Sequence, residues 1–201
     1  MRIGKLEITG SFFLLAAWLN YLDRYALVPL AMLACALHEL GHYAAAKRLG
    51  CGVRKIRLTA VGAEMKLSGQ LGYGGEIAVA AAGPCVNLLL ACIFCRWEWG
   101  CVFAGLNLAL GCFNLLPIGR LDGGRIVYCV LAVLLGPDLA CAAEGCLDIF
   151  WVTLLLAAGV ILCGAAGNIT LLLVALWLMG IYSGVKKTGN RSCQEKQKQV
   201  K

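Results

Sequence analysis

The sequence carries little charge and has almost no histidine. Asp, Glu, Lys and Arg together make up 14% of its 201 residues, whereas hydrophobic residues make up 61%. A soluble domain of this length usually carries far more charge, so the composition predicts an integral membrane protein. The longest stretch that is not apolar, roughly residues 47–75, is too short to bury a core of its own. The short length of this stretch excludes a separate globular domain of ordinary size.

The charge that is present has a net value of +7, which in a soluble protein could indicate nucleic-acid binding. Here the basic residues lie at the ends of apolar segments, where membrane topology places them, so we expect no nucleic-acid partner. The 12 cysteines fall mostly inside apolar runs, where a thiol packs as a small hydrophobic group. This placement argues against a disulfide scaffold.

Six apolar segments approach the length needed to span a bilayer of about 30 Å. They cover residues 8–22, 25–46, 76–95, 99–118, 149–165 and 168–184. We therefore expect an all-α polytopic membrane protein with about six transmembrane helices. Basic residues in the loop after the second segment and in the tail then place the N- and C-termini in the cytoplasm. We expect residues 1–185 to form a single domain with its core at 25–130, followed by a basic cytoplasmic tail at 186–201.

Residues 53–67 differ from the apolar segments on either side. Charged and apolar side chains nearly alternate there around Gly62, which predicts a small membrane-associated β-hairpin after the second helix. An interfacial amphipathic loop is the alternative. If a hairpin forms, its edge could receive an extended substrate.

The two histidines of the chain lie four residues apart, in His38-Glu39-Leu40-Gly41-His42, within an apolar run. Residues at this spacing share one face of a helix, so two imidazoles can bind one metal ion there. The glutamate beside the first histidine is then placed to take a proton from a water molecule at the metal. The pattern predicts a hydrolytic zinc site at membrane depth.

A hydrolytic zinc site takes three protein ligands, and the chain has no third histidine. Asp122 is the preferred candidate, because Pro117 and nearby glycines loosen the end of a membrane helix before it. A turn residue that caps a short helix is the alternative explanation of Asp122. Cys35, one helical turn before His38, is a second candidate ligand.

Three motifs in this order resemble the site-2 protease family of intramembrane zinc metalloproteases, over roughly residues 25–130. They are His38-Glu39-Leu40-Gly41-His42, then Ala82-Gly83-Pro84-Cys85-Val86-Asn87, and then Asn114-Leu115-Leu116-Pro117 with Leu121-Asp122-Gly123-Gly124. Within the family the chain looks most like the short six-span bacterial members of the sporulation type. Many of those carry a C-terminal CBS domain, which we do not expect here.

The resemblance implies a role for each matching residue. His38, His42 and Asp122 would hold one Zn²⁺ per chain, and Glu39 would be the general base and later the proton donor. Asn87 and Asn114 look like the family's polar residues near the active site, which bind substrate backbone or the developing oxyanion. The alternative for both asparagines is a hydrogen bond between neighbouring helices.

The expected function is hydrolysis of a peptide bond within or next to a transmembrane segment, as in regulated intramembrane proteolysis. The expected partners are a membrane protein or membrane-associated peptide as substrate and the lipid bilayer. The sequence names neither the substrate nor a regulatory membrane partner. The resemblance implies the bacterial plasma membrane as the location. A catalytically silent membrane scaffold of the same family is the alternative, although Glu39 would have no purpose in it.

Overall fold

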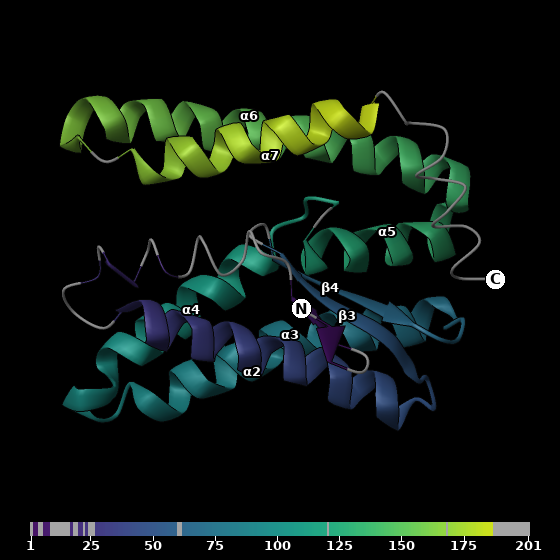
Figure 1. The fold of residues 1–201 in the computed structure, drawn as a ribbon. Coiled ribbons are helices and arrows are strands. Elements are labelled where there is room, and N and C mark those ends of the chain that lie inside the picture. The colour runs from purple at the N-terminus through teal and green to yellow at the C-terminus, as the bar shows by residue number, and fades with distance from the viewer. Residues whose placement is uncertain are drawn as a thin grey trace. The chain divides into compact units, whose positions relative to one another are not determined.

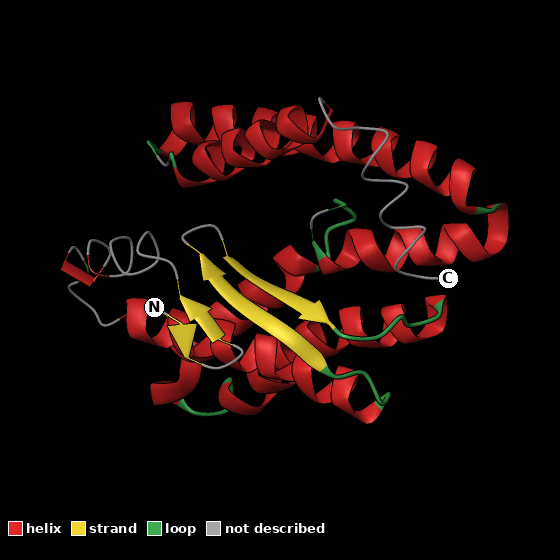
Figure 2. Ribbon diagram, turned by 45° about the vertical axis from the view of Figure 1, so that its right-hand side comes forward, coloured by secondary structure: helices red, strands yellow, loops and turns green. Residues whose placement is uncertain are grey.

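The computed structural model describes residues 2–3, 6–8, 17, 20–21, 23, 27–59, 62–119, 121–167 and 169–186. The chain divides into two compact units, residues 1–115 and 116–201. Both consist largely of helices, and the first also contains a β-sheet (Figures 1 and 2).

The first unit packs three helices together, α2 (Leu27–Arg48), α3 (Tyr73–Phe94) and α4 (Cys101–Asn114). A short 3₁₀ turn, η1 (Glu98–Gly100), leads into α4. Helix α3 packs against both α2 and α4, and α2 also contacts α4 (Figure 1). The pair of histidines predicted from the sequence therefore lies on a helix with two neighbouring helices to support it.

Local sequence signals account for both ends of α2. Near its start, a carboxylate oxygen of Asp23 accepts a hydrogen bond of 2.7 Å from the backbone N–H of Val28, a free donor at a helix N-terminus. At its end, Gly50 adopts a left-handed conformation with φ of 76°, which glycine reaches without strain. Lys47 and Arg48 in the last turn complement the negative end of the helix dipole.

The sheet of the first unit has four strands, β1 (Arg2–Ile3), β2 (Leu6–Ile8), β3 (Val53–Thr59) and β4 (Gly62–Leu67). Their order is β1-β2-β3-β4, so β1 and β4 form the two edges (Figure 2). Strand β2 runs parallel to β3, while β1–β2 and β3–β4 are antiparallel. Lys55 and Glu7 form an ion pair between the central strands.

The second unit consists of α5 (Asp122–Leu135), α6 (Pro137–Ala166) and α7 (Thr170–Lys186). Gly136, with φ of 87°, separates α5 from α6, and Pro137 begins α6 at a position where its missing N–H costs no helical hydrogen bond. Helix α6 packs against both α5 and α7.

The expectation of an all-α protein with six spans and a lone hairpin is wrong. Residues 53–67 belong to a four-stranded sheet that also includes β1 and β2. Within the described ranges, three helices, α2, α3 and α6, are long and apolar enough to cross a membrane. Helix α4 has 14 residues, about 21 Å, and α7 has 17 residues, so both are shorter than these three helices.

Two other expectations lie largely outside the described residues. The expected first span, 8–22, includes a few isolated described positions only, and 187–201 of the basic tail are not described.

Candidate metal centre

Helix α2 carries His38, Glu39 and His42, and it buries the two histidines. Their side chains are only 5% and 7% exposed, whereas Leu40 between them is 56% exposed. This follows from helical periodicity, because positions four apart share a face and the position midway between them points elsewhere. Glu39, one position after His38, is half-buried.

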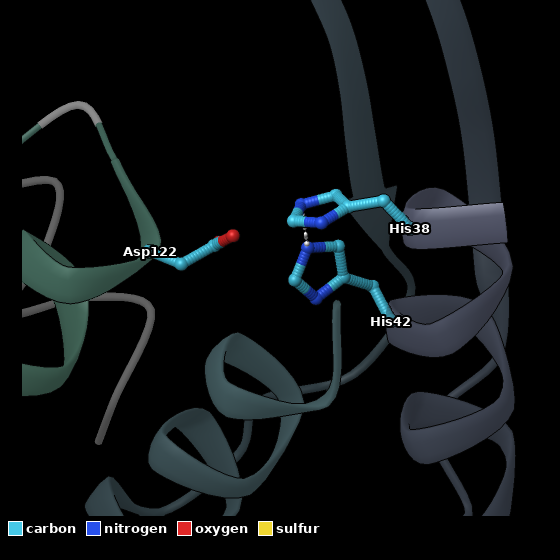
Figure 3. Close-up of side chains that lie close together, drawn as sticks. All are labelled: His38, His42 and Asp122. Carbon is cyan, nitrogen blue, oxygen red and sulfur yellow. Dashed lines mark hydrogen bonds between the residues drawn. The ribbon is translucent and has the colours of Figure 1, made fainter. Parts of the chain in front are cut away.

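The two imidazole rings present their Nε2 atoms to each other (Figure 3). His42 Nδ1 lies 2.7 Å from the carbonyl oxygen of Val79, and His38 Nδ1 lies 2.9 Å from Asn87 Oδ1. Both partners are oxygen acceptors, so each Nδ1 carries the proton and donates it. In the neutral rings each Nε2 then has its lone pair available for a metal ion.

The separation of these two lone-pair atoms fits one metal ion. The Nε2 atoms are 3.1 Å apart. Two nitrogen ligands about 2.0 Å from a tetrahedral zinc ion lie roughly 3.3 Å from each other. Two unprotonated nitrogens at this distance repel each other, and a cation between them removes that repulsion. The histidine pair thus has the geometry of a bidentate zinc ligand.

Glycine residues let helix α3 approach the rings closely. A methyl group at Gly83 would lie 2.4 Å from His42 Nε2 and 2.8 Å from His38 Cε1. A methyl group at Gly41 on α2 would lie 2.8 Å from the carbonyl oxygen of Ala82 on α3. Both contacts are shorter than carbon atoms tolerate, so the helix pair and the ring positions depend on glycine at 41 and 83.

We expect Gly83→Ala to reduce zinc affinity by about 10-fold or more, as for the loss of a group that orients metal ligands. The added methyl would displace the metal-binding edge of both rings. Gly105→Ala on α4 is the matched control, because a methyl there meets nothing within 4 Å. Competition against a chromogenic chelator would measure both affinities. Equal zinc affinity in the two variants would show that the rings do not bind metal through Nε2.

Asn87 and Asn114, the two asparagines singled out by the resemblance, lie in different surroundings. Asn87 is fully buried on α3, and it contacts His38 through Oδ1 and Asn107 through Nδ2. Asn114 is half-buried at the end of α4, where its Nδ2 donates to the carbonyl oxygen of Leu110 at 3.0 Å. Asn87 thus bonds to a histidine ring, whereas Asn114 bonds to a backbone carbonyl of its own helix.

Asn107 was not singled out from the sequence. It is fully buried on α4, and its side chain bonds to Asn87. The available signal was a second amide within the apolar helix, seven residues before Asn114 on the same face.

Asp122 is the first residue of α5 in the second unit, and its side chain is buried. The loop before it folds back on itself, since Leu121 N–H donates to the carbonyl of Ile118 at 2.8 Å. A methyl group at Gly124 would lie 2.1 Å from the same Ile118 oxygen, which explains the glycine there. The Gly119 N–H donates to Asp148 Oδ1 on α6 at 2.7 Å. These contacts fix the conformation of the segment that carries Asp122.

Two imidazole nitrogens from α2 and a carboxylate from α5 are the donors drawn in Figure 3. Nitrogen and carboxylate ligands are typical of zinc in hydrolytic sites. Cys35, the alternative candidate ligand, is an exposed residue, unlike the buried His38 one turn along the helix.

Comparison with known proteins finds similarity to zinc metalloproteases and to a site-2 protease. The model of "Peptidase family M50" matches residues 97–158. A solved structure, a site-2 protease from Methanocaldococcus jannaschii, superposes with a TM-score of 0.68 at 25% identity, covering 93% of this chain and 92% of that one.

Two curated relatives agree with these matches. A zinc metalloprotease of Methanocaldococcus jannaschii is 30% identical over 144 residues, 64% of this chain and 42% of that protein. A relative from Mycobacterium tuberculosis is 34% identical over 113 residues, 47% of this chain and 28% of that protein. The matched region thus spans less than half the length of each curated relative.

Proposed function

We propose that this chain belongs to the site-2 protease family, peptidase family M50, and that it is an intramembrane zinc metalloprotease. It is an integral membrane protein, with three apolar helices long enough to span the bilayer among its described residues. The observation that carries the proposal is the buried histidine pair, whose Nδ1 atoms are both committed to oxygen acceptors. Such a pair leaves two lone pairs directed at one position.

In this proposal His38, His42 and Asp122 hold one zinc ion. Zinc, when bound, supplies a Lewis acid that polarises the scissile carbonyl and activates water. The Asp122 carboxylate adds a negative charge to two neutral imidazoles, which strengthens the binding of a divalent cation. The burial of all three side chains excludes bulk water that would otherwise weaken these electrostatic interactions.

Glu39 is the proposed general base. Its carboxylate takes a proton from the attacking water and then gives a proton to the leaving amine of the cleaved peptide. Asn114 is proposed to stabilise the substrate backbone or the developing oxyanion. Asn87 has both ends of its amide occupied by His38 and Asn107, so we assign it to the support of His38.

The proposed substrate is a membrane protein or membrane-associated peptide, cut within or next to a transmembrane segment. We place the enzyme in the bacterial plasma membrane with both termini in the cytoplasm, since basic residues gather near Lys47 and in the tail. Residues 1–185 would act as one metalloprotease domain with its core at 25–130, because the proposed ligands come from α2 and α5. Residues 186–201 would be the basic tail.

Strand β4 is the proposed acceptor of the unwound substrate. A helical substrate bonds its own carbonyls and must become extended before one carbonyl is exposed, and an extended peptide can add to a sheet edge. Residues 53–58 lie in β3, which pairs with β2 and β4 on its two sides. Among the described strands, β4 is therefore the edge strand of the segment 53–67.

Proline substitutions in β4 test this role. Met65 pairs with Ile56 and Lys66 pairs with Lys55, and the N–H groups of successive strand residues point to opposite sides. Proline at the position whose N–H points away from β3 should lower cleavage about 3- to 10-fold, the value of one main-chain hydrogen bond. Proline at the other position should instead lower the melting temperature. Unchanged cleavage in both variants would exclude β4 as the acceptor.

The proposed activity is tested by cleavage in proteoliposomes that contain the purified protein and single-span substrates with helix-breaking residues near mid-membrane. We expect cuts inside the span, located by mass spectrometry, that stop on chelation and return with added zinc. Cleavage that continues after chelation would contradict a metalloprotease.

A further inference from the structure

A chain of buried hydrogen bonds connects helix α4 to His38. Asn107 Nδ2 donates to the carbonyl oxygen of Phe103 at 2.9 Å. Asn87 Nδ2 on α3 donates to Asn107 Oδ1 at 3.1 Å, and Asn87 Oδ1 lies 2.9 Å from His38 Nδ1. Both asparagines are 0% exposed, so water does not compete for these groups. This series of hydrogen bonds ends at the imidazole ring of His38, which is proposed to bind zinc.

The donor and acceptor of every hydrogen bond in this series follow from the first one, between Asn107 and the carbonyl of Phe103. A backbone carbonyl can only accept, so the amide nitrogen of Asn107 must face Phe103 and its oxygen must face Asn87. That oxygen can only accept, so Asn87 must present Nδ2 to Asn107 and Oδ1 to His38. His38 Nδ1 must then donate, which in the neutral ring leaves Nε2 unprotonated.

We propose that Asn107 is a positioning residue that sets the tautomer of His38 by fixing the orientation of the Asn87 amide. The inference rests on the proposed function in one respect, since it takes His38 Nε2 as the zinc ligand. Asn107 itself touches neither histidine ring in this chain of bonds. It acts through Asn87.

The two histidines differ in how much they depend on such support. His42 Nδ1 bonds to the backbone carbonyl of Val79, an acceptor that cannot be exchanged for a donor. His38 Nδ1 bonds to a primary amide, whose oxygen and nitrogen exchange places on a half-turn. If the Asn87 amide turned, it would present N–H groups to His38 Nδ1. The proton would then move to His38 Nε2, and a protonated nitrogen does not bind a metal.

The test first removes the amide of Asn107. It then replaces the amide of residue 87 by a carboxylate, so that a turn of this side chain no longer changes the atom that faces His38. Asn107→Leu keeps a similar size but offers no hydrogen bond. Asn87→Asp presents an oxygen to His38 in either orientation, as in the carboxylate–histidine–zinc arrangement. The four proteins to compare are the wild type, Asn107→Leu, Asn87→Asp and the double variant. Each is the full chain in detergent, purified without a histidine tag.

Two readouts are used on each protein. Chelator competition gives the zinc dissociation constant, and ¹⁵N NMR of histidine-labelled protein gives the tautomer before and after zinc is added. The chain has two histidines, so the spectrum holds the signals of two rings only. Protonated and unprotonated ring nitrogens resonate far apart.

We expect Asn107→Leu to weaken zinc binding about 10- to 100-fold, the usual effect of losing a group behind a metal ligand. The His38 ring should shift towards the Nε2-protonated tautomer, and that of His42 should not. In the Asn87→Asp background the same leucine should leave the zinc dissociation constant unchanged. A packing role for Asn107 would not produce that rescue.

Three results would overturn the proposal. They are an unchanged His38 tautomer in Asn107→Leu, an equally large zinc defect in the Asn87→Asp background, or a wild-type His38 protonated on Nε2. The last needs no variant, so it applies even if Asn107→Leu does not fold. A wild type that shows the expected tautomers but binds no zinc would instead contradict the proposed function and leave the hydrogen-bond chain intact.

Discussion

Glu39→Gln is expected to abolish proteolysis while zinc stays bound. Glutamine keeps the size of the side chain but cannot take up a proton, and loss of a general base lowers the rate of the chemical step by about 10² to 10⁴-fold. Glu39 is not one of the proposed ligands, so the zinc dissociation constant should stay within a few fold of the wild type. Cleavage in proteoliposomes and chelator competition measure the two quantities on one preparation.

Glu98→Gln is the matched control for this experiment. It makes the same change at an exposed glutamate in the η1 turn that leads into α4. It should leave both cleavage and zinc binding unaltered. Full cleavage by Glu39→Gln would remove Glu39 from the mechanism. Zinc binding without cleavage in the wild type as well would favour a catalytically silent scaffold.

Asp122→Ala is expected to weaken zinc binding by more than about 100-fold, beyond the range seen when only a supporting group behind a ligand is lost. Alanine removes one of three proposed ligands together with its negative charge, and leaves two neutral imidazoles. The side chain is buried at the start of α5, so a small apolar replacement should be accommodated without unfolding. The metal content after dialysis against a weak chelator is the quantity to compare.

Asp138→Ala is the matched control, because Asp138 lies in the first turn of the next helix and is exposed. It should retain zinc fully. Retention of zinc by Asp122→Ala would mean that the third ligand is another residue. Cys35 would then be examined next by the same substitution to alanine.

The histidine pair could be predicted from the sequence, because its logic is local. A spacing of four residues places both rings on one face of any helix, whatever surrounds it. The acceptors behind the rings are different. Val79 contributes a backbone carbonyl, which no side-chain pattern indicates, and Asn107 is placed by the packing of α4 on α3. Their roles depend on contacts between distant segments.

The number of spans could not be predicted, because apolar windows do not give helix ends. The window at 149–165 suggested a helix of its own, yet α6 begins at Pro137. The acidic residues that interrupt hydropathy, Glu144 and Asp148, lie inside that helix, and Asp148 binds the N–H of Gly119. Hydropathy counts such carboxylates against a helix, whereas the fold uses one of them to hold the loop before Asp122.

The pairing of the strands could not be predicted from the sequence either. Alternation in 53–67 indicated extended structure, because residues of opposite character line the two faces of a strand. It gave no sign that β2, about fifty residues earlier in the chain, pairs in parallel with β3 from Leu6 to Ile8. That pairing moves the free edge to β4, and with it the proposed position of the substrate.

The most direct test of the account is the zinc content of the detergent-purified wild type beside His42→Ala. The two Nε2 atoms at 3.1 Å predict about one zinc ion per chain in the wild type and a loss of zinc in the variant. A wild type that takes up no zinc when it is supplied, or a His42→Ala protein that keeps its full zinc content, would contradict the metalloprotease assignment.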